Sequence, residues 1–510
     1  RRWHNRGARP WRPRYDSLVM ESLQRDISDE RDARRPDGRD ELDKSNSPAT
    51  RPKRNRRDKR DNGIDMLNGP LPGKILRFAI PLALSSILQQ LLNSADASIA
   101  GQFVSSFSLA GIGGVNPVTA MFVNLFVGLS IGANVVVAMH VGAGEFHSIK
   151  KSVHTAMALS LIAGVVLGGA GLALAPWVLD AIGMPEDSLA DALTYVRLYF
   201  CAIPFLTIYN FGSALLRAHG DAKRPLYALA AAVVVNFVLD LAFVRLFGWG
   251  TAGIGIATVI AAALSAVIVV AFLMREEGPF RLHLRELRIC GPELAGILRI
   301  GIPAGIQGAV FSLSNTVVQA TINGFGSAAI AGSAATLNFE YYTYFFVNAF
   351  GQTAVTFTGQ NFAAKNADRC RAIFRWCVLF GFTSSLILGV TFTALGTRAL
   401  GLFTTDAAAL SFGLVRLWFV ELPDCLTTFY EVPAGAMRGM GWSTLPAVIT
   451  ILGSCVLRVA LVTWVFPLSG TWDTLMVIYP VTWSFMIVAM LVSYFIVRRR
   501  CYRSIEPAAA

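Results

Sequence analysis

Charged side chains are scarce in this sequence. Asp, Glu, Lys and Arg make up 15% of the 510 residues, and hydrophobic residues make up 54%. A soluble globular protein carries about 25% charged residues. Apolar stretches of about 20 residues, enough to cross a hydrocarbon layer roughly 30 Å thick, recur between Ile75 and Val497. The composition excludes a soluble globular protein and indicates a chain that crosses a membrane many times.

Cysteine pairs and catalytic motifs are also lacking. The seven cysteines are odd in number and show no Cys-x-x-Cys spacing, which argues against structural disulfides and a zinc site. The sequence has no His-Glu-x-x-His motif and no acidic metal-binding motif. We therefore expect a protein that is not an enzyme and needs no cofactor.

Basic residues are missing from alternate loops. The loops 99–112, 179–189, 322–333 and 468–473 contain no Lys or Arg, whereas the loops between them are strongly basic. Arg245 and Arg398, each near the end of an apolar stretch, are the exceptions. Because basic loops stay in the cytoplasm, we expect a multi-pass protein of the inner (plasma) membrane. Both termini would then be cytoplasmic, which requires an even number of spans.

The N-terminal region differs from the rest of the chain. Residues 1–73 hold 19 Lys/Arg and 13 Asp/Glu, and so account for half of the net charge of +12. Such a segment cannot bury a core, and we expect a disordered basic tail, either simply solvated or attracted to anionic lipid. The remaining positive charge lies in short loops, so we expect membrane lipid and no nucleic acid as a partner.

The apolar stretches predict twelve spans in two halves. The domains would be the tail 1–73, an N-lobe at 74–274, a cytoplasmic linker at 275–294, a C-lobe at 295–497 and a C-terminal tail at 498–510. The predicted spans are 75–98, 113–140, 152–178, 190–215, 225–247, 252–274, 295–321, 334–358, 372–396, 408–432, 444–467 and 474–497.

The two halves repeat each other in sequence. Three motifs recur at offsets of 222, 219 and 221 residues: Ile75–Pro81 as Ile297–Pro303, Val196–Pro204 as Val415–Pro423, and Arg217–Pro225 as Arg438–Pro446. Six spans per half is an even number, so both halves face the same way. We expect an all-α polytopic membrane protein with twelve transmembrane helices in two parallel six-helix lobes around a central cleft. This arrangement favours a transporter over a static channel.

Several motifs, in this order along the chain, resemble the multidrug and toxic compound extrusion (MATE) family. They are Gly69-Pro70 before Lys74–Pro81, Asn93–Gly101, Ala214–Asp221 with Pro225, Asn236–Asp240, and Gly359–Asn366, which departs by having Ala363 and Lys365 where glycines are usual. The resemblance implies export of cationic or amphipathic compounds, driven by inward flow of H⁺ or Na⁺ without ATP. The lack of any phosphate-binding loop agrees with this.

Carboxylates inside spans are the candidates for ion coupling, since a charged side chain in hydrocarbon is costly unless it is paired, hydrated or protonated. Asp96 lies in the first span, where Gln89 and Asn93 share its helix face and are candidate supporting residues. Asp240 lies in the fifth span, four residues after Asn236. Asp240 pairing with Arg245, and a helix-end role for Asp96, are the structural alternatives.

A hydroxyl from the sixth span, that of Thr258, would complete an oxygen site for a small cation or a proton. The resemblance implies that Asp96, Asn236, Asp240 and Thr258 form the cation-coupling site, with Na⁺ as a possible metal. The second half carries Val318, Leu457 and Leu461 at the positions equivalent to Asp96, Asn236 and Asp240. We therefore expect coupling in the first lobe.

Acids and aromatic residues of the second half are candidates for the substrate cavity. They are Glu340, Tyr341, Tyr344, Asn315 and Asn338, where aromatic faces would bind an organic cation. The alternatives are pairing of Glu340 with Arg416 or Arg458, and an interfacial aromatic belt. For Glu421, Asp424 and Glu431 we favour such pairing, or a position near a span end.

The sequence thus predicts a monomeric secondary antiporter that exports small organic, often cationic, compounds in exchange for H⁺ or Na⁺. A flippase for a lipid-linked precursor is the alternative from the same fold superfamily, although it would need more deep basic residues. A receptor or channel without coupled transport is a third possibility.

Overall fold

The computed structural model describes residues 63–181 and 183–505, and these form helices and connecting segments without any strand. The N-lobe contains α2 (Leu71–Ile99), η2 (Ala100–Val104), α3 (Ser106–Ala143), α4 (Phe146–Ala181), α5 (Glu186–His219), α6 (Lys223–Leu241), η3 (Ala242–Leu246) and α7 (Gly250–Met274). Two short 3₁₀ turns, η4 (Gly278–Phe280) and η5 (Leu284–Glu286), lie in the linker.

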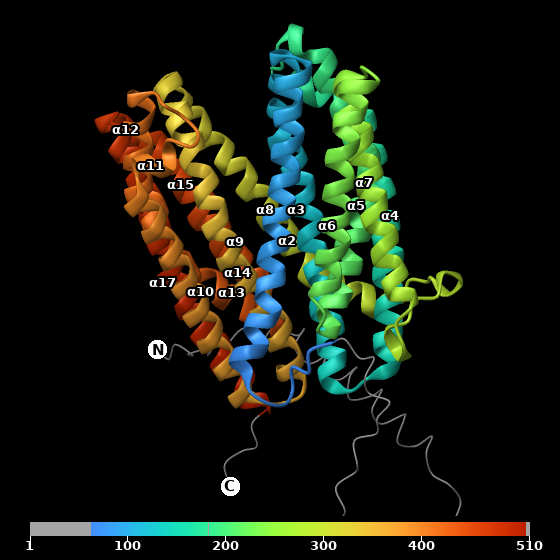
Figure 1. The fold of residues 1–510 in the computed structure, drawn as a ribbon. Coiled ribbons are helices and arrows are strands. Elements are labelled where there is room, and N and C mark those ends of the chain that lie inside the picture. Colours follow the sequence, from blue (N-terminus) through green and yellow to red (C-terminus); the bar gives the residue numbers. More distant parts are fainter. Residues whose placement is uncertain (1–62, 182, 506–510) are drawn as a thin grey trace, which may run out of the picture. The chain divides into compact units, whose positions relative to one another are not determined.

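The C-lobe is more broken into segments. It contains α8 (Gly291–Asn323), α9 (Ser327–Ala363), α10 (Ala367–Leu395), α11 (Thr397–Leu400), α12 (Ala407–Arg416), η6 (Leu417–Glu421), η7 (Leu422–Thr427), α13 (Thr428–Gly439), α14 (Thr444–Thr450), η8 (Ile451–Leu457), α15 (Arg458–Ala460), η9 (Leu461–Val465), α16 (Phe466–Ser469) and α17 (Trp472–Ile505). The helices of the N-lobe and the helices of the C-lobe form two groups that lie side by side (Figure 1).

Joined end to end, these segments make twelve long helical rods in the described part of the chain, in the order of the twelve predicted spans. Most rods extend several residues beyond the predicted spans. Ten of them are long and apolar enough to cross a membrane. The other two are α9, which carries the half-buried Glu340, and the rod from α12 to α13, which carries the buried Arg416, Glu421, Asp424 and Arg438. The predicted fold class is confirmed.

The sequence repeat has a counterpart in the backbone. Gly220 follows α5 and Gly441 follows α13, and their φ angles are 103° and 86°. Glycine adopts this left-handed conformation without the steric cost that a Cβ imposes. The repeated motifs therefore end the fourth rod of each lobe in the same way.

The two lobes are joined near one end of the rods, where the Lys- and Arg-rich segments between α7 and α8 and around Lys365 lie; we call it the basic end. Asn124 of α3 donates to Ser312 of α8 at 2.7 Å. Gln360 of α9 donates to the carbonyl of Ala218 at 2.8 Å. The contacts of His140, Thr356 and Gln360 between the lobes lie in the half of the rods nearer this end, and the bond from Asn124 to Ser312 lies nearer their middle.

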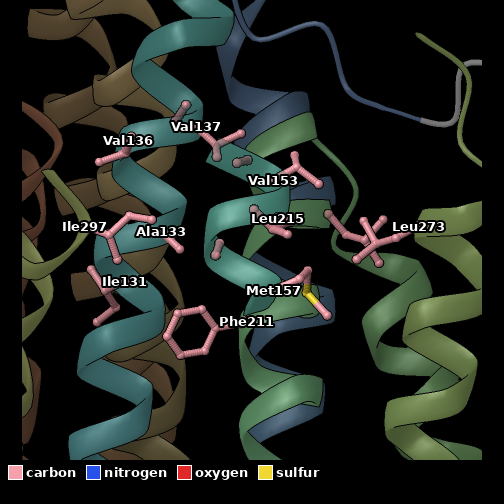
Figure 2. Packing of buried hydrophobic residues seen from close by; sticks show 14 of the residues in the cluster. Ile131, Ala133, Val136, Val137, Val153, Met157, Phe211, Leu215, Leu273 and Ile297 are labelled. Carbon is pink, nitrogen blue, oxygen red and sulfur yellow. The ribbon is translucent and has the colours of Figure 1, made fainter. Parts of the chain in front are cut away.

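Helices α3 and α8 approach each other closely along this junction. A Cβ atom built on Gly128 of α3 would lie 2.1 Å from the backbone nitrogen of Gly305 on α8, a distance that real side chains do not reach. Apolar side chains fill the space beside the contact, and Figure 2 shows Ile297 of α8 next to Ile131 and Ala133 of α3. The absence of side chains at the glycines is what allows the two lobes to pack here.

The segment before α2 is ordered and connects both lobes. The backbone nitrogen of Ile64 donates to the carbonyl of Gly220 in the N-lobe at 3.0 Å. On the C-lobe side, Asn361 and Arg369 donate to the carbonyl of Met66 at 3.2 and 3.0 Å. The prediction of a disordered tail up to residue 73 is therefore wrong for residues 63–73, because their backbone carbonyls accept side-chain hydrogen bonds. Residues 1–62 lie outside the described residues.

The C-terminal boundary also differs from the prediction. Residues 498–505, expected to be a tail, continue α17 to Ile505. Apolar contacts hold this turn in place, since Cys501 and Tyr502 are buried in the C-lobe core. A tail can begin only after Ile505, and residues 506–510 lie outside the described part of the chain.

Gly128→Ala should lower the stability of the folded protein, by about 1–3 kcal/mol, because the added methyl group overpacks the contact with α8. Gly113→Ala, on the same helix with nothing within 4 Å of a built Cβ, is the matched control. It should be neutral or stabilising by up to about 1 kcal/mol, since alanine favours a helix. Thermal unfolding of the two purified variants measures the difference; equal stabilities would contradict the close contact.

Candidate ion-coupling site

Two carboxylates from different helices lie buried next to each other in the N-lobe. Asp96 belongs to the last turn of α2 and is 1% exposed, and Asp240 lies near the end of α6 and is 0% exposed. Each is followed within a few residues by a π-helical segment, η2 or η3. Such interruptions of the α-helix are frequent at functional sites. Here they occur beside both acids of the site.

Neutral polar groups surround Asp96. The hydroxyl of Thr258 on α7 donates to Oδ2 of Asp96 at 3.1 Å. The phenol of Tyr195 on α5 donates to the same oxygen at 3.3 Å. Both donors are buried. Three helices thus converge on one carboxylate oxygen.

The amide of Asn236 links the two acids. One terminal atom of this amide lies 3.2 Å from Oδ1 of Asp96 and 3.2 Å from Oδ2 of Asp240. When that atom is the nitrogen, the amide donates a hydrogen bond to both carboxylates. The second oxygen of Asp240, Oδ1, is buried and has no hydrogen-bond partner among the described residues. Turned the other way, the amide would offer its oxygen, which is the kind of ligand that hard cations take.

No basic side chain neutralises this pair within the described residues. The guanidinium of Arg245, which could have paired with Asp240, instead lies over the ring of Phe103, 4.6 Å from its centroid. Two ionised carboxylates held together in an apolar interior repel each other and lose their hydration. The arrangement therefore binds a proton or a small cation more readily than it stays empty and doubly charged.

The structure brings together all four residues predicted for coupling, but not the two supporting residues. Gln89 is half-buried and Asn93 is exposed, and no hydrogen bond joins either to the carboxylates in the described residues. Sequence reasoning missed Tyr195, which contacts Asp96 directly, and Tyr199, one turn further along α5. Their only signal was a pair of tyrosines four residues apart in an apolar span.

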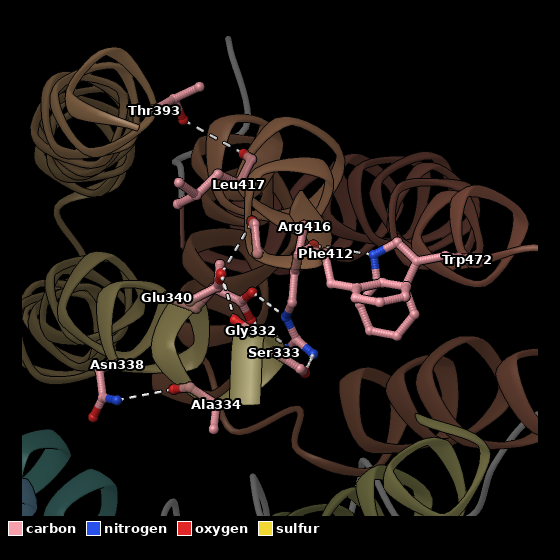
Figure 3. A network of polar contacts seen from close by, with 12 residues as sticks. Gly332, Ser333, Ala334, Asn338, Glu340, Thr393, Phe412, Arg416, Leu417 and Trp472 are labelled. Atoms are coloured by element: carbon pink, nitrogen blue, oxygen red, sulfur yellow. Dashed lines mark hydrogen bonds and ion pairs between the residues drawn. The ribbon is translucent and has the colours of Figure 1, made fainter. Parts of the chain in front are cut away.

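Glu340 of the C-lobe is held in an ion pair. The guanidinium of Arg416 donates to its two carboxylate oxygens at 2.6 and 2.8 Å, and to the hydroxyl of Ser333 at 2.6 Å (Figure 3). Bidentate pairing of this kind satisfies both charges. Of the alternatives for Glu340, the geometry favours pairing with Arg416 over contact with a substrate.

The other candidate substrate residues each make separate contacts. Asn338 donates to the carbonyl of Ala334, and Asn315 accepts from Arg458 at 3.3 Å. Tyr341 is exposed and stacks beside Phe345, as an aromatic belt would. Tyr344 differs, because its phenol donates to the carboxylate of Glu431 at 3.4 Å, and both side chains are partly exposed.

One group of possible metal ligands lies at the basic end, where His154 of α4 approaches His283 and Glu286 of the linker. Both nitrogens of His154 are already engaged: Nδ1 with the carbonyl of Lys150 at 2.8 Å, and Nε2 with the backbone nitrogen of His283 at 3.2 Å. The ammonium of Lys150, 2.6 Å from the Glu286 carboxylate, lowers the pKa of that carboxyl. These residues fasten the linker to α4 and leave little room for a metal.

Comparison with known proteins gives one family match. A family model described as MatE matches residues 81–242 and 303–464, once in each half, and the two ranges are offset by 222 residues. The curated relatives include a probable multidrug resistance protein, YoeA, of Bacillus subtilis, 25% identical over 73% of this chain and 82% of that protein. The multidrug export protein MepA of Staphylococcus aureus is 20% identical over 83% of this chain and 92% of that protein.

Solved structures show the same fold. A transporter of the MOP superfamily from Pyrococcus furiosus aligns with a TM-score of 0.79 at 21% identity, covering 88% of this chain and 99% of that one. An outward-facing multidrug resistance transporter of the MATE family also gives a TM-score of 0.79 at 21% identity, over 87% of this chain and 98% of that one. At this identity the likeness establishes the architecture alone.

Glu340→Gln should destabilise the protein by about 3 kcal/mol, because it leaves the buried charge of Arg416 without a counter-ion. The double variant Glu340→Gln/Arg416→Met should recover most of the loss. Thermal unfolding of both variants measures the coupling. Unchanged stability of Glu340→Gln together with weaker substrate binding would instead assign Glu340 to the substrate cavity.

Proposed function

The chain belongs to the MatE family of membrane transporters, and from this premise we propose that it is a secondary antiporter exporting cationic or amphipathic small organic compounds in exchange for H⁺ or Na⁺. The observation that carries the proposal is the buried pair Asp96 and Asp240, which lacks a basic partner in the described residues. The names of YoeA and MepA, which refer to multidrug resistance and export, support the substrate class. They favour this function over the flippase alternative.

The distribution of charge supports an orientation. We propose that the basic end faces the cytoplasm, since basic loops are retained there, and that both termini lie on that side of the inner membrane. The hydrogen bonds from Thr356 to Asn134 and from Gln360 to the carbonyl of Ala218 join the lobes near this end. The structure would then correspond to a state closed toward the cytoplasm, from which a substrate leaves outward.

Helix α2 offers a physical connection between the ion site and the lobe arrangement. Its first turns pack in an apolar cluster with the C-lobe, where the ring of Phe78 meets Phe357 edge-on at 5.4 Å. Its last turn carries Asp96 in the N-lobe. A cation that binds Asp96 more tightly in one position of α2 than in another shifts the population of lobe arrangements, as coupling requires.

We assign the substrate contact in the C-lobe to Tyr344 and Glu431 in place of Glu340. Both residues are partly exposed, and their phenol and carboxylate would offer an aromatic face and a negative charge to an organic cation. The N-lobe at 74–274, the linker at 275–294 and the C-lobe at 295–497 are the proposed functional units, and a monomer contains both sites.

Asp240→Asn should reduce gradient-driven efflux by about tenfold or more, because the amide carries no charge for a proton or Na⁺ to neutralise. Dye efflux is measured in vesicles containing the variant, with an imposed H⁺ gradient and, separately, an Na⁺ gradient. The gradient that drives efflux in the unaltered protein identifies the coupling ion.

The control is Asp473→Asn, which removes an exposed carboxylate at the start of α17. It should leave efflux unchanged. Elution of each variant as a single peak in size-exclusion chromatography shows that the protein is folded. Full efflux by a folded Asp240→Asn variant would refute the site, and no efflux by the unaltered protein under either gradient would refute the antiporter.

A further inference from the structure

A histidine of the N-lobe lies between two carboxylates at the basic end. His140 belongs to the last turn of α3. Its Nδ1 lies 2.8 Å from Oε2 of Glu145, in the short connection to α4. Its Nε2 lies 3.1 Å from Oε2 of Glu293, in the first turn of α8. The second of these contacts joins the N-lobe to the C-lobe.

Local structure holds both acids in place around the ring. Gly144, with a φ of 74°, ends α3 and turns the chain back. The backbone nitrogen of Glu145 then donates to the carbonyl of His140 at 3.0 Å. Glu293 lies at the N-terminus of α8, where the helix dipole favours a carboxylate, and the hydroxyl of Ser152 on α4 donates to its Oε2 at 2.6 Å. The imidazole therefore meets two acids that are already positioned.

The two contacts together require a protonated ring. A neutral imidazole donates from one nitrogen and accepts at the other, and the accepting nitrogen would then face a carboxylate oxygen that also accepts. Both contacts are satisfied when His140 is an imidazolium, which donates from Nδ1 to Glu145 and from Nε2 to Glu293. The extra proton belongs on the ring, because imidazole is a stronger base than a carboxylate. With the lobes arranged in this way, His140 carries a positive charge.

The surroundings screen this charge only weakly. The side chains of His140 and Glu293 are 17% and 11% exposed, so that little water lies between them. Lys151 of α4 is a further charged group near the contact and acts on Glu293. Gln360 of α9 and Gly441 after α13, which meet this turn of α3, are uncharged. Without the extra proton, a neutral ring would face two carboxylates and would lose one of its two hydrogen bonds.

Other hydrogen bonds that join the lobes near the basic end do not depend on pH. Thr356 donates to Asn134 at 3.0 Å, and Gln360 donates to the carbonyl of Ala218 at 2.8 Å. Hydroxyl and amide groups keep the same charge at ordinary pH, whereas histidine changes its charge between about pH 5 and 8. The strength of the junction between the lobes therefore depends on pH through His140.

We propose that the contact between His140 and Glu293 is a pH-dependent latch between the lobes. With its proton, His140 holds the first turn of α8 against the end of α3 and stabilises the arrangement in which the lobes are joined at the basic end. When the ring releases its proton to water, the latch weakens and the lobes separate there more readily. In the orientation proposed above, the latch responds to the pH of the cytoplasm. It goes beyond the proposed function and does not involve Asp96 or Asp240.

The test measures the separation of the lobes at the basic end in the purified full chain. Non-canonical amino acids that carry spin labels replace Arg275 at the end of α7 and Ala364 at the end of α9, which are both exposed. Electron paramagnetic resonance gives the distribution of distances between the labels. Raising the pH from about 6 to about 8.5, across the range in which histidine titrates, should shift the unaltered protein toward longer distances. The ratio of separated to joined molecules should rise by about tenfold, since a hydrogen bond to a charged group is lost.

Two substitutions of the histidine distinguish its charge from its shape. His140→Gln has no charge at any pH, and should show at both pH values the longer distances of the unaltered protein at high pH. His140→Lys keeps its charge across this range, and should keep the lobes joined at both. The matched control is His147→Gln, which removes an exposed histidine at the start of α4 and should leave the full response to pH.

A substitution in the other lobe tests the same contact independently. Glu293→Gln leaves His140 in place but removes the charge of its partner, and should also abolish most of the response to pH. The test therefore stands if His140→Gln does not fold. Asp240→Asn should retain the part of the response that His140→Gln removes, so that a failure of the latch and a failure of the coupling site are distinguishable.

Three outcomes would overturn the latch. They are distances in the unaltered protein that do not change with pH, a folded His140→Gln or Glu293→Gln variant that responds as the unaltered protein does, and a His140→Lys variant that behaves as His140→Gln does. The last outcome would show that the charge of the ring does not hold the lobes together.

Discussion

The function proposed for this protein depends on the free-energy cost of burying a carboxylate away from water and from any cation. For Glu340, the ion pair with Arg416 offsets that cost, and the two side chains form a fixed structural contact. Asp96 and Asp240 have only neutral donors, so their charge depends on what binds them. A buried acid with a basic partner has one state, whereas one without such a partner has two, and two states are what an ion-driven transporter requires.

The two lobes share a backbone plan but differ in where their charges lie. The glycines that follow α5 and α13 adopt the same left-handed conformation, and the family match recurs at one offset. The acids of the N-lobe have only apolar counterparts, such as Val318 and Leu461, in the C-lobe. Turn geometry needs a particular residue type at a particular place, whereas a buried acid needs only suitable neighbours, and different rods can supply those.

Irregular helical segments lie beside the buried acids, and α2 contacts both lobes. Segments η2 and η3 follow Asp96 and Asp240 of the N-lobe, and η6 and η7 carry Glu421 and Asp424 of the C-lobe. Local departures from the α-helix turn side chains toward neighbouring helices that a regular helix would miss. Helix α2 lies in the C-lobe cluster at its start and in the N-lobe site at its end, so that neither lobe can rearrange without affecting it.

The sequence by itself determined the twelve spans and the parallel repeat, since span length, loop charge and recurring motifs are local properties of a chain in a bilayer. The four residues of the proposed coupling site followed from buried carboxylates within spans and from the family resemblance. The tertiary structure decided the partners. Tyr195 meets Asp96 across 99 positions of sequence, and Arg416 reaches Glu340 rather than Glu421. It also ordered residues 63–73, whose carbonyls are bound by Asn361 and Arg369 some 300 residues away. Such choices depend on which surfaces meet after folding, and spacing along the chain carries no record of them.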